Sequence, residues 1–293
     1  MKLLITGDWH LTDKSPENRI DNYEQSVLRK LEFIIDTASK EKVELIIQPG
    51  DFTDTPSMSY SMFIKVIKII KNSPIFIATV FGQHDLRYRN KDNTAMLAID
   101  RACPNVLLGL NEYYQSPVFI HSAGWEDPIP KPLLKAFNIL ITHRMIIDNK
   151  LWEGQEDCET GNTFLKQHKF DLIVSGDNHQ YFYAQQDNRW LFNCGSLMRS
   201  NVTQVDYLPR ILIFDTVSRE WKVIFIPIEP AEKVFKMEQV VKTKERDEKL
   251  EAFVEGLSTH KEMGLSFEDN LQAYMKVNNI NPSVQDIIKG SMI

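Results

Sequence analysis

The chain has 293 residues, 43% of them hydrophobic and 25% charged, which is ample material for a large globular core. Its net charge of −6 does not indicate a nucleic-acid partner, so such a partner would need a local basic patch or a metal ion. No apolar run approaches the roughly 20 residues that span a bilayer, and three scattered cysteines without a CxxC pair argue against a zinc knuckle and favour a reducing compartment.

Over residues 1–80, short apolar runs alternate with longer amphipathic stretches. Strands are predicted at residues 2–6, 45–48 and 75–80, and helices at residues 21–39 and 59–71. An alternating order of strands and helices is typical of parallel strands covered by helices.

The rest of the chain is richer in predicted strands. These fall at residues 106–108, 118–122, 138–142, 172–175, 189–193, 210–215 and 221–226. Such a strand-rich half indicates mixed or antiparallel pairing, so we predict a layered α/β sandwich over residues 1–228. Pro227 and Pro230 bracket the predicted boundary. Residues 229–293 are expected to be a short helical region, with helices at 233–257 and 265–293.

Polar side chains follow five of the predicted strands at the point where each strand ends. They are Asp8 and His10; Asp51; Gln83, His84 and Asp85; His143; and Asp177 and His179. In open α/β sheets, ligands bind outside the carboxyl ends of the strands. Each short motif alone is also typical of a simple turn, but the ordered set predicts a metal centre. His121, His168 and His260 lie elsewhere and are expected to be ordinary surface or core histidines.

The ordered set DxH, GD, GQHD, H and GDNH resembles the motifs of the calcineurin-like metallophosphoesterase superfamily. Within it, the stretches GDWHL, HDLRYRN and NCGSLMRSNVTQVDYLPRILIFDT resemble the SbcD-type DNA nucleases of bacteria and phages. The resemblance implies an α/β/β/α sandwich with a small helical C-terminal appendage. It also implies a cytoplasmic location in a bacterium or a phage-infected host, in line with an N-terminus too short in apolar residues for a signal peptide.

The resemblance further implies two divalent ions, manganese or else magnesium. Asp8, His10 and His179 would hold one ion, Gln83, His143 and Asp177 the other, and Asp51 would bridge them. His84 would protonate or stabilise the leaving oxygen, and Asp85 would orient His84. Two positions depart from the family pattern, which usually has Asn in place of Gln83 and His in place of Asp177. A carboxylate at residue 177 favours a hard ion such as manganese or magnesium.

Basic residues near these motifs are candidate DNA contacts: Arg87 and Arg89 after His84, and Arg199 further along. The resemblance implies an SbcC-type coiled-coil ATPase as partner and leaves a homodimer open. Residues 229–293 are either a reduced cap or the segment that binds this ATPase. Two apolar stripes there, Phe267 with Leu271, Tyr274 and Met275, and Val284 with Ile287 and Ile288, fit either core packing or partner binding.

We therefore expect a metal-dependent exonuclease and endonuclease subunit of an SbcCD-like complex, acting in DNA end processing, repair or recombination. One alternative is a phosphodiesterase or phosphatase on another phosphoester, with the same metals. A second alternative is a catalytically silent scaffold that binds DNA ends.

Overall fold

The computed structural model describes residues 1–149, 159–259, 271, 275, 280–282 and 284–285. The chain divides into two compact units, Met1–Lys236 and Met237–Ile293. In the second unit, the described helix is α6 (Met237–Thr259). Among the residues that are described, no helix is long and apolar enough to cross a membrane.

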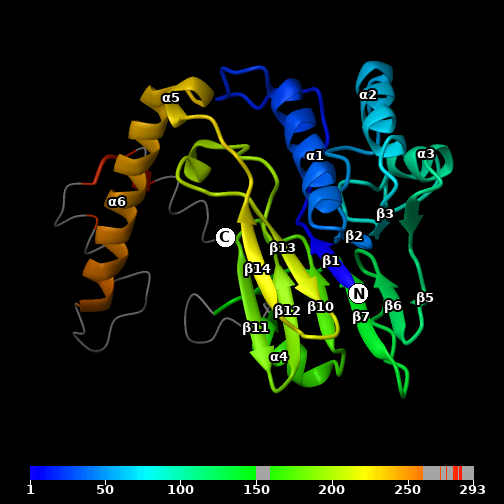
Figure 1. Ribbon diagram of the computed structural model, residues 1–293. Helices are drawn as coiled ribbons and strands as arrows, with labels where there is room; N and C mark the ends of the chain where they lie inside the picture. Colours follow the sequence, from blue (N-terminus) through cyan, green and yellow to red (C-terminus); the bar gives the residue numbers. More distant parts are fainter. Residues whose placement is uncertain (150–158, 260–270, 272–274, 276–279, 283, 286–293) are drawn as a thin grey trace. The chain divides into compact units, whose positions relative to one another are not determined.

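The first unit is built on two six-stranded mixed sheets (Figure 1). The first sheet has the order β14 (Trp221–Phe225), β13 (Arg210–Asp215), β1 (Lys2–Ile5), β2 (Leu45–Gln48), β3 (Phe76–Thr79) and β4 (Val106–Leu108). The second has the order β11 (Phe182–Gln186), β12 (Arg189–Asn193), β10 (Leu172–Ser175), β7 (Phe137–Thr142), β6 (Val118–Ala123) and β5 (Glu112–Gln115). A small pair, β8 (Ile146–Ile147) and β9 (Glu159–Thr160), is separate from both sheets.

The strands that precede the candidate site run parallel within each sheet. In the first sheet β1, β2 and β3 are parallel neighbours, and in the second β7 and β10 are. Their carboxyl ends therefore lie at one edge of each sheet, which brings the five polar motifs together.

Helices begin where a polar side chain caps the first turn. In α1 (Tyr23–Lys40), α2 (Tyr60–Lys71), α3 (Ala95–Ala102) and α4 (Gly161–Gln167), the residue before the helix accepts a backbone N–H of that turn; these caps are Asn22, Ser59, Thr94 and Thr160. A 3₁₀ turn, Val202–Gln204, and the short helix α5 (Ala231–Val234) complete the unit.

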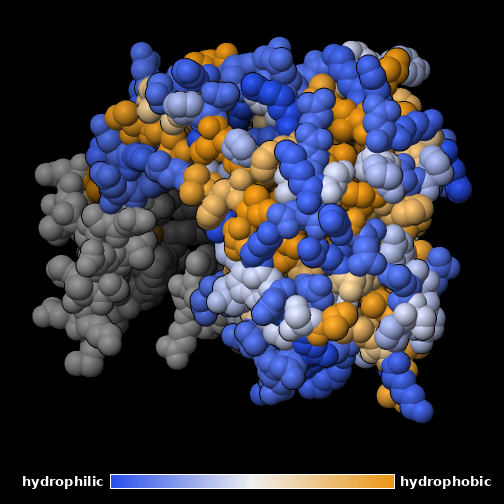
Figure 2. Space-filling view, viewed as in Figure 1, coloured by the Kyte–Doolittle hydropathy of each residue, from blue (hydrophilic) through white to orange (hydrophobic). Residues whose placement is uncertain are grey.

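Alternating side chains on the central strands separate three layers of core. Leu4 of β1 faces the cluster that contains α1, α2 and α3, whereas Leu3 and Ile5 face the second sheet. On the far side of the second sheet, Leu140 and Ile173 pack with α4. The order is therefore helix, sheet, sheet, helix, and the predicted α/β sandwich is confirmed. On the face that Figure 2 shows, hydrophilic residues cover much of the surface, with hydrophobic patches between them.

The predicted helix at residues 233–257 is interrupted. Phe235 has extended backbone angles, pairs with Arg19 and is buried, so the chain leaves α5 and starts α6 only at Met237. The predicted helix at 265–293, with its two apolar stripes, lies almost entirely outside the described residues.

Candidate metal centre

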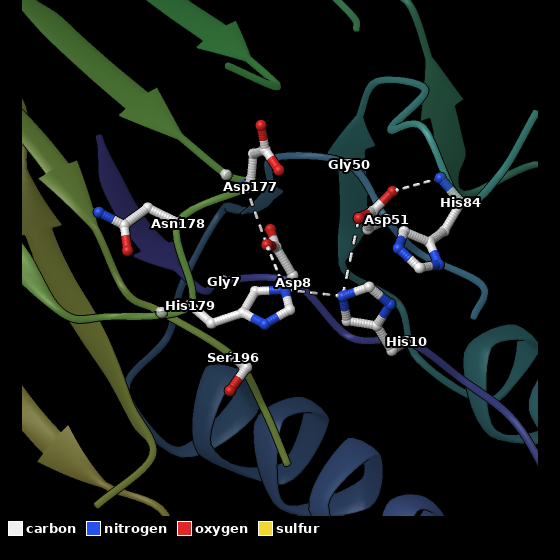
Figure 3. Close-up of polar contacts among 12 residues, drawn as sticks. Gly7, Asp8, His10, Gly50, Asp51, His84, Asp177, Asn178, His179 and Ser196 are labelled. Carbon is white, nitrogen blue, oxygen red and sulfur yellow. Dashed lines mark hydrogen bonds and ion pairs between the residues drawn. The ribbon is translucent and has the colours of Figure 1, made fainter. Parts of the chain in front are cut away.

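The polar residues that follow β1, β2, β3, β7 and β10 converge at the carboxyl ends of the two sheets. Figure 3 shows Asp8, His10, Asp51 and His179 directed toward one another, with His84 beside them. Backbone hydrogen bonds hold the loops in register, since the carbonyl of Asp51 accepts from the amides of both Trp9 and His10. The structure thus brings together residues that are far apart in the sequence, such as Asp8 and Asp177.

Asp8, His10 and His179 form a first cluster whose ligand atoms could hold a metal ion. The Nε2 atoms of His10 and His179 face each other at 3.0 Å, and Nε2 of His179 lies 3.6 Å from Oδ2 of Asp8. Two imidazole nitrogens and a carboxylate that converge in this way form a donor set suited to a divalent transition metal.

Asp8, Asp51 and His143 form a second cluster, which is completely buried. Nδ1 of His143 lies 2.8 Å from the carbonyl oxygen of Pro49, and because a carbonyl only accepts, Nδ1 must carry the proton. In the neutral ring, the form that binds a metal, the lone pair is then on Nε2, 3.3 Å from Oδ2 of Asp51. A backbone carbonyl that fixes the tautomer of a histidine in this way is typical of metal ligands.

Gln83 and Asp177 lie beside this second cluster and contact each other. Nε2 of Gln83 donates to Oδ1 of Asp177 over 2.9 Å, which leaves the amide oxygen of Gln83 free. The backbone N–H of Asp177 donates to Oδ2 of Asp8 over 2.9 Å. Asp177 belongs to none of the three clusters that could hold a metal among the described residues.

Buried ligand atoms without hydrogen bonds supply the test of fit for metal ions. In the described part of the chain, seven buried side-chain atoms have no hydrogen-bond partner. Five of them belong to the proposed ligands. Four are Asp8 Oδ1, Asp51 Oδ2, Gln83 Oε1 and His143 Nε2, and the fifth, His10 Nδ1, lies 3.6 Å from Oδ1 of Asp54 on the side of the ring away from His179. Since buried polar atoms are nearly always satisfied, this concentration is what a pair of bound cations would explain. The donor atoms of the proposed ligands are therefore suited to binding divalent metal ions.

The charges of the centre perturb its own pKa values. Burial raises the pKa of Asp8 to about 7, and the nearby Asp51 carboxylate adds to the rise. Burial lowers the pKa of His179 to about 4, with a further contribution from His10. Burial would also lower the pKa of His143, but its contact with the Asp51 carboxylate outweighs that effect and raises the pKa to about 10. Carboxylates crowded this closely are stabilised by a cation.

His84 lies at the exposed edge of the centre, and its ring is edge-on to that of His10 at 4.8 Å. Its Nδ1 lies 2.9 Å from the carbonyl oxygen of Asp54 and must donate to it, so Nε2 is not used in this hydrogen bond. His84 also groups with His10 and Asp51 in a third set of possible ligand atoms. Asp54 contacts His10 as well, at 3.6 Å. Sequence reasoning missed Asp54, although it stands only three residues after Asp51.

The expected contact between Asp85 and His84 does not occur, and this prediction is corrected. The Asp85 carboxylate is fully buried and accepts the backbone N–H groups of Phe52, Thr53 and Gly82. Burial raises its pKa to about 6. Asp85 therefore holds the two ligand loops together, and the carbonyl of Asp54 orients His84.

Three of the proposed ligands have left-handed backbone conformations. The φ angles are 46° at His10, 47° at Asp51 and 75° at Asp177. Such angles are uncommon outside glycine and cost about 1–3 kcal/mol each, and they cluster at functional sites. Glycines beside the ligands supply the space: a Cβ on Gly82 would lie 2.1 Å from Oδ1 of Asp51.

The three arginines predicted to contact DNA lie in different environments. Arg87 and Arg89 flank Tyr88 on an exposed turn closed by paired hydrogen bonds between Arg87 and Asn90. Tyr88 is 98% exposed. Arg199, by contrast, is buried and donates to the carbonyls of Val205 and Glu229, so it is not an exposed DNA contact and that prediction is corrected.

Trp9, His121 and His168 have structural roles. Trp9 is buried against Phe52, with its indole N–H donating to Thr6. His121 is buried and contacts Asn138, and His168 caps the end of α4. His260 lies outside the described residues.

Comparison with known proteins gives a family match over residues 1–181, to the family described as calcineurin-like phosphoesterase. Two solved structures are similar to the chain. One, of a novel archaeal phosphodiesterase, is 17% identical, with a TM-score of 0.44, and covers 77% of this chain and 99% of its own. The other, TT1561 of Thermus thermophilus, is 12% identical, with a TM-score of 0.50 and the same two coverages. No curated protein matches the sequence.

Proposed function

The chain belongs to the calcineurin-like phosphoesterase family, and from that premise we propose that it is a metal-dependent nuclease that hydrolyses DNA phosphodiesters. The family supports a phosphoester hydrolase that uses divalent metals. The choice of DNA as substrate is our proposal, and the observation that carries it is the exposed turn of Arg87, Tyr88 and Arg89 next to His84.

The proposed assignment gives each ligand one role. One ion would be held by Asp8, His10 and His179. The second would be held by Gln83, His143 and Asp177. Asp51 would contact both ions. When bound, two such ions supply a nucleophile and neutralise charge on the phosphodiester. The ions are proposed to be manganese or magnesium, because aspartate and amide oxygens make up much of the donor set.

His84 is proposed to give a proton to the leaving oxygen. Its Nδ1 donates to the Asp54 carbonyl, so Nε2 is the nitrogen that would give the proton. A positioned histidine of this kind contributes about 10²–10⁴ in rate. Its exposure at the edge of the centre suits a group that must reach a bulky substrate.

The exposed turn is proposed to bind the DNA backbone and an adjacent base. Arg87 is anchored by a hydrogen bond to Ser57, and Arg89 lies over the ring of Trp125 and 3.5 Å from Glu126. Arginines neutralise phosphates, and an exposed tyrosine can support an unstacked base. Both arginine side chains are held close to the catalytic edge by these contacts.

Hydrolysis of linear duplex DNA and of a small chromogenic phosphodiester, each with added manganese, tests this proposal. The double variant of Arg87→Gln and Arg89→Gln should lose DNA cleavage at least tenfold yet keep hydrolysis of the small diester. Arg101→Gln is the matched control, since Arg101 is also an exposed arginine near a carboxylate. Hydrolysis of the small diester without any DNA cleavage by the unchanged protein would favour another phosphoester. DNA binding without hydrolysis of either would favour a silent scaffold.

The coiled-coil ATPase partner and the homodimer remain predictions. We propose that the segment after Lys236 binds the ATPase, in keeping with the resemblance. Co-purification of the full chain with such an ATPase, compared with a chain that ends at Lys236, tests it.

A further inference from the structure

A cavity of about 190 Å³ lies apart from the metal ligands, beside the first half of α1. Its walls come from the loop before α1, from α1 itself, from Arg199 and from the segment that follows β14. Six charged residues line it: Arg19, Asp21, Arg29, Lys30, Arg199 and Glu229. Apart from Ser26, the rest of the lining is apolar. We call it the basic cavity.

Positive charge exceeds negative charge in this lining. The guanidinium of Arg19 makes two hydrogen bonds of 2.7 Å to the carboxylate of Asp21, and Arg29 lies 3.7 Å from Glu229. These two pairs leave Lys30 and Arg199 as the remaining lining cations. Asp206, outside the lining, contributes a further negative charge near Arg199. A net positive charge remains even when Asp206 is counted.

Lys30 is the least satisfied of these groups. Its ammonium has three N–H donors, and among the described residues it makes one hydrogen bond, 2.8 Å long, to the carbonyl of Leu197. Burial lowers the pKa of Lys30 to about 7, and the charges of Arg199 and Arg19 lower it further. A partly buried ammonium without a carboxylate partner is costly, so an anion in the cavity would stabilise it.

Arg199 is held in position by neutral partners. Its two terminal nitrogens donate to the carbonyls of Val205 and Glu229, and its guanidinium lies 5.6 Å from the ring centroid of Phe235. These contacts orient the group without neutralising its charge. The positive charge of Arg199 therefore remains available to a ligand.

We propose that the basic cavity binds a small phosphate-type oxyanion, either free phosphate or the terminal phosphate of an oligonucleotide. The volume is below the range of about 300–1,000 Å³ that holds drug-sized ligands, which excludes a whole nucleotide. A tetrahedral anion accepts several N–H donors at once, which suits one ammonium and adjacent guanidinium groups. The site does not depend on the proposed nuclease activity.

The basic cavity is linked to the metal centre through one residue. The carbonyl of Leu197 accepts the ammonium of Lys30, and the N–H of Leu197 donates to the carbonyl of Asp8 over 2.8 Å. An anion bound to Lys30 would thus be held next to the loop that follows β12, which contains Leu197. We expect it to stabilise that loop and the folded protein.

Phosphate titration of the purified full chain in EDTA tests the proposal, because chelation removes metal ions from the other site. Inorganic phosphate should raise the melting temperature with the logarithm of its concentration above the dissociation constant, and calorimetry should give one site. Lys30→Met should weaken phosphate binding at least tenfold. Lys65→Met is the matched control: Lys65 is an exposed lysine paired with Glu24, and its loss should change nothing.

A second arm identifies the source of the anion. A 5′-phosphorylated oligonucleotide that binds more tightly than its unphosphorylated form, with the difference lost in Lys30→Met, would assign a nucleic-acid end; binding of inorganic phosphate alone would assign the free ion. If Lys30→Met fails to fold, Arg29→Gln at a half-exposed position should still weaken binding severalfold. No phosphate binding by the unchanged protein, or equal binding by the folded lysine variant, would overturn the proposal.

Discussion

Replacing Gly176 by alanine should disable the centre through one methyl group. Gly176 follows β10 and has no left-handed φ, so the backbone itself accepts alanine. A Cβ there, however, would lie 2.5 Å from Oδ1 of Asp8, 2.7 Å from Nδ1 of His143 and 2.7 Å from the carbonyl oxygen of Pro49. Gly176 is thus required by the ligands around it.

The geometry sets the size of the effect. Real Cβ contacts under 3.0 Å essentially do not occur, so Asp8 must move by roughly 0.5 Å or the histidine must leave its hydrogen bond to Pro49. Metal sites tolerate ligand distances within about 0.2 Å of their preferred values. A misplacement approaching 1 Å can cost on the order of 10² in rate. We therefore expect Gly176→Ala to lose manganese affinity and about 100-fold in hydrolysis.

The assay combines manganese binding by calorimetry with hydrolysis of a small phosphodiester, and circular dichroism verifies folding. Gly109→Ala is the matched control, because Gly109 has φ +68° and an added Cβ would meet no atom within 4 Å. That variant should cost about 1 kcal/mol in stability through backbone strain and leave the rate unchanged. A folded Gly176→Ala protein with normal manganese binding and rate would refute the reasoning.

Substitutions at His84, Asp177 and Lys30 give further predictions. His84→Asn should keep bound manganese and lower turnover by about 10²–10⁴, and loss of manganese in that variant would make His84 a ligand. Asp177→His should stay active but need more manganese to saturate, whereas Asp177→Ala should lose most activity; superimposable titrations would mean that Asp177 only shapes the turn. Because the pKa of Lys30 is lowered to about 7 from 10.5, the folded state binds fewer protons than the unfolded state between those values, and stability should rise with pH there. Lys30→Met should remove that rise in stability, which is worth at most about 5 kcal/mol. The variant should therefore be more stable than the unchanged protein, most of all at pH 7 and below. Urea unfolding of both proteins at pH 7 and pH 9 measures the difference.

The sequence predicted the sandwich because its central strands are continuous apolar runs that end abruptly at polar motifs. Edge strands carry a weaker signal. The strand Glu112–Gln115 is largely exposed, and Phe182–Gln186 follows directly after the loop of His179. The two-residue turn Asp187-Asn188, with Asp187 at φ +55°, joins β11 to β12. This Asp-Asn pair was the signal in the sequence that could have predicted the hairpin.

Most members of the site could be predicted from the sequence, although Asp54 was missed, but the contacts between them could not. Asp8, Asp51 and His143 each follow the carboxyl end of a parallel strand, and this position brings them together without any detailed knowledge of the packing. The partner of Asp85 depends on which backbone amides two loops present, and the burial of Arg199 depends on a segment thirty residues further along. Such long-range contacts leave no periodic pattern in the sequence, so they emerge only from the folded chain.

Anomalous scattering from manganese-soaked crystals is the most direct test of a two-ion centre built from these loops. We expect two manganese peaks: one within ligand distance of Asp8, His10 and His179, and one within ligand distance of Gln83, His143 and Asp177. Asp51 should contact both. A single peak, or a second peak that contacts neither His143 nor Asp51, would contradict it.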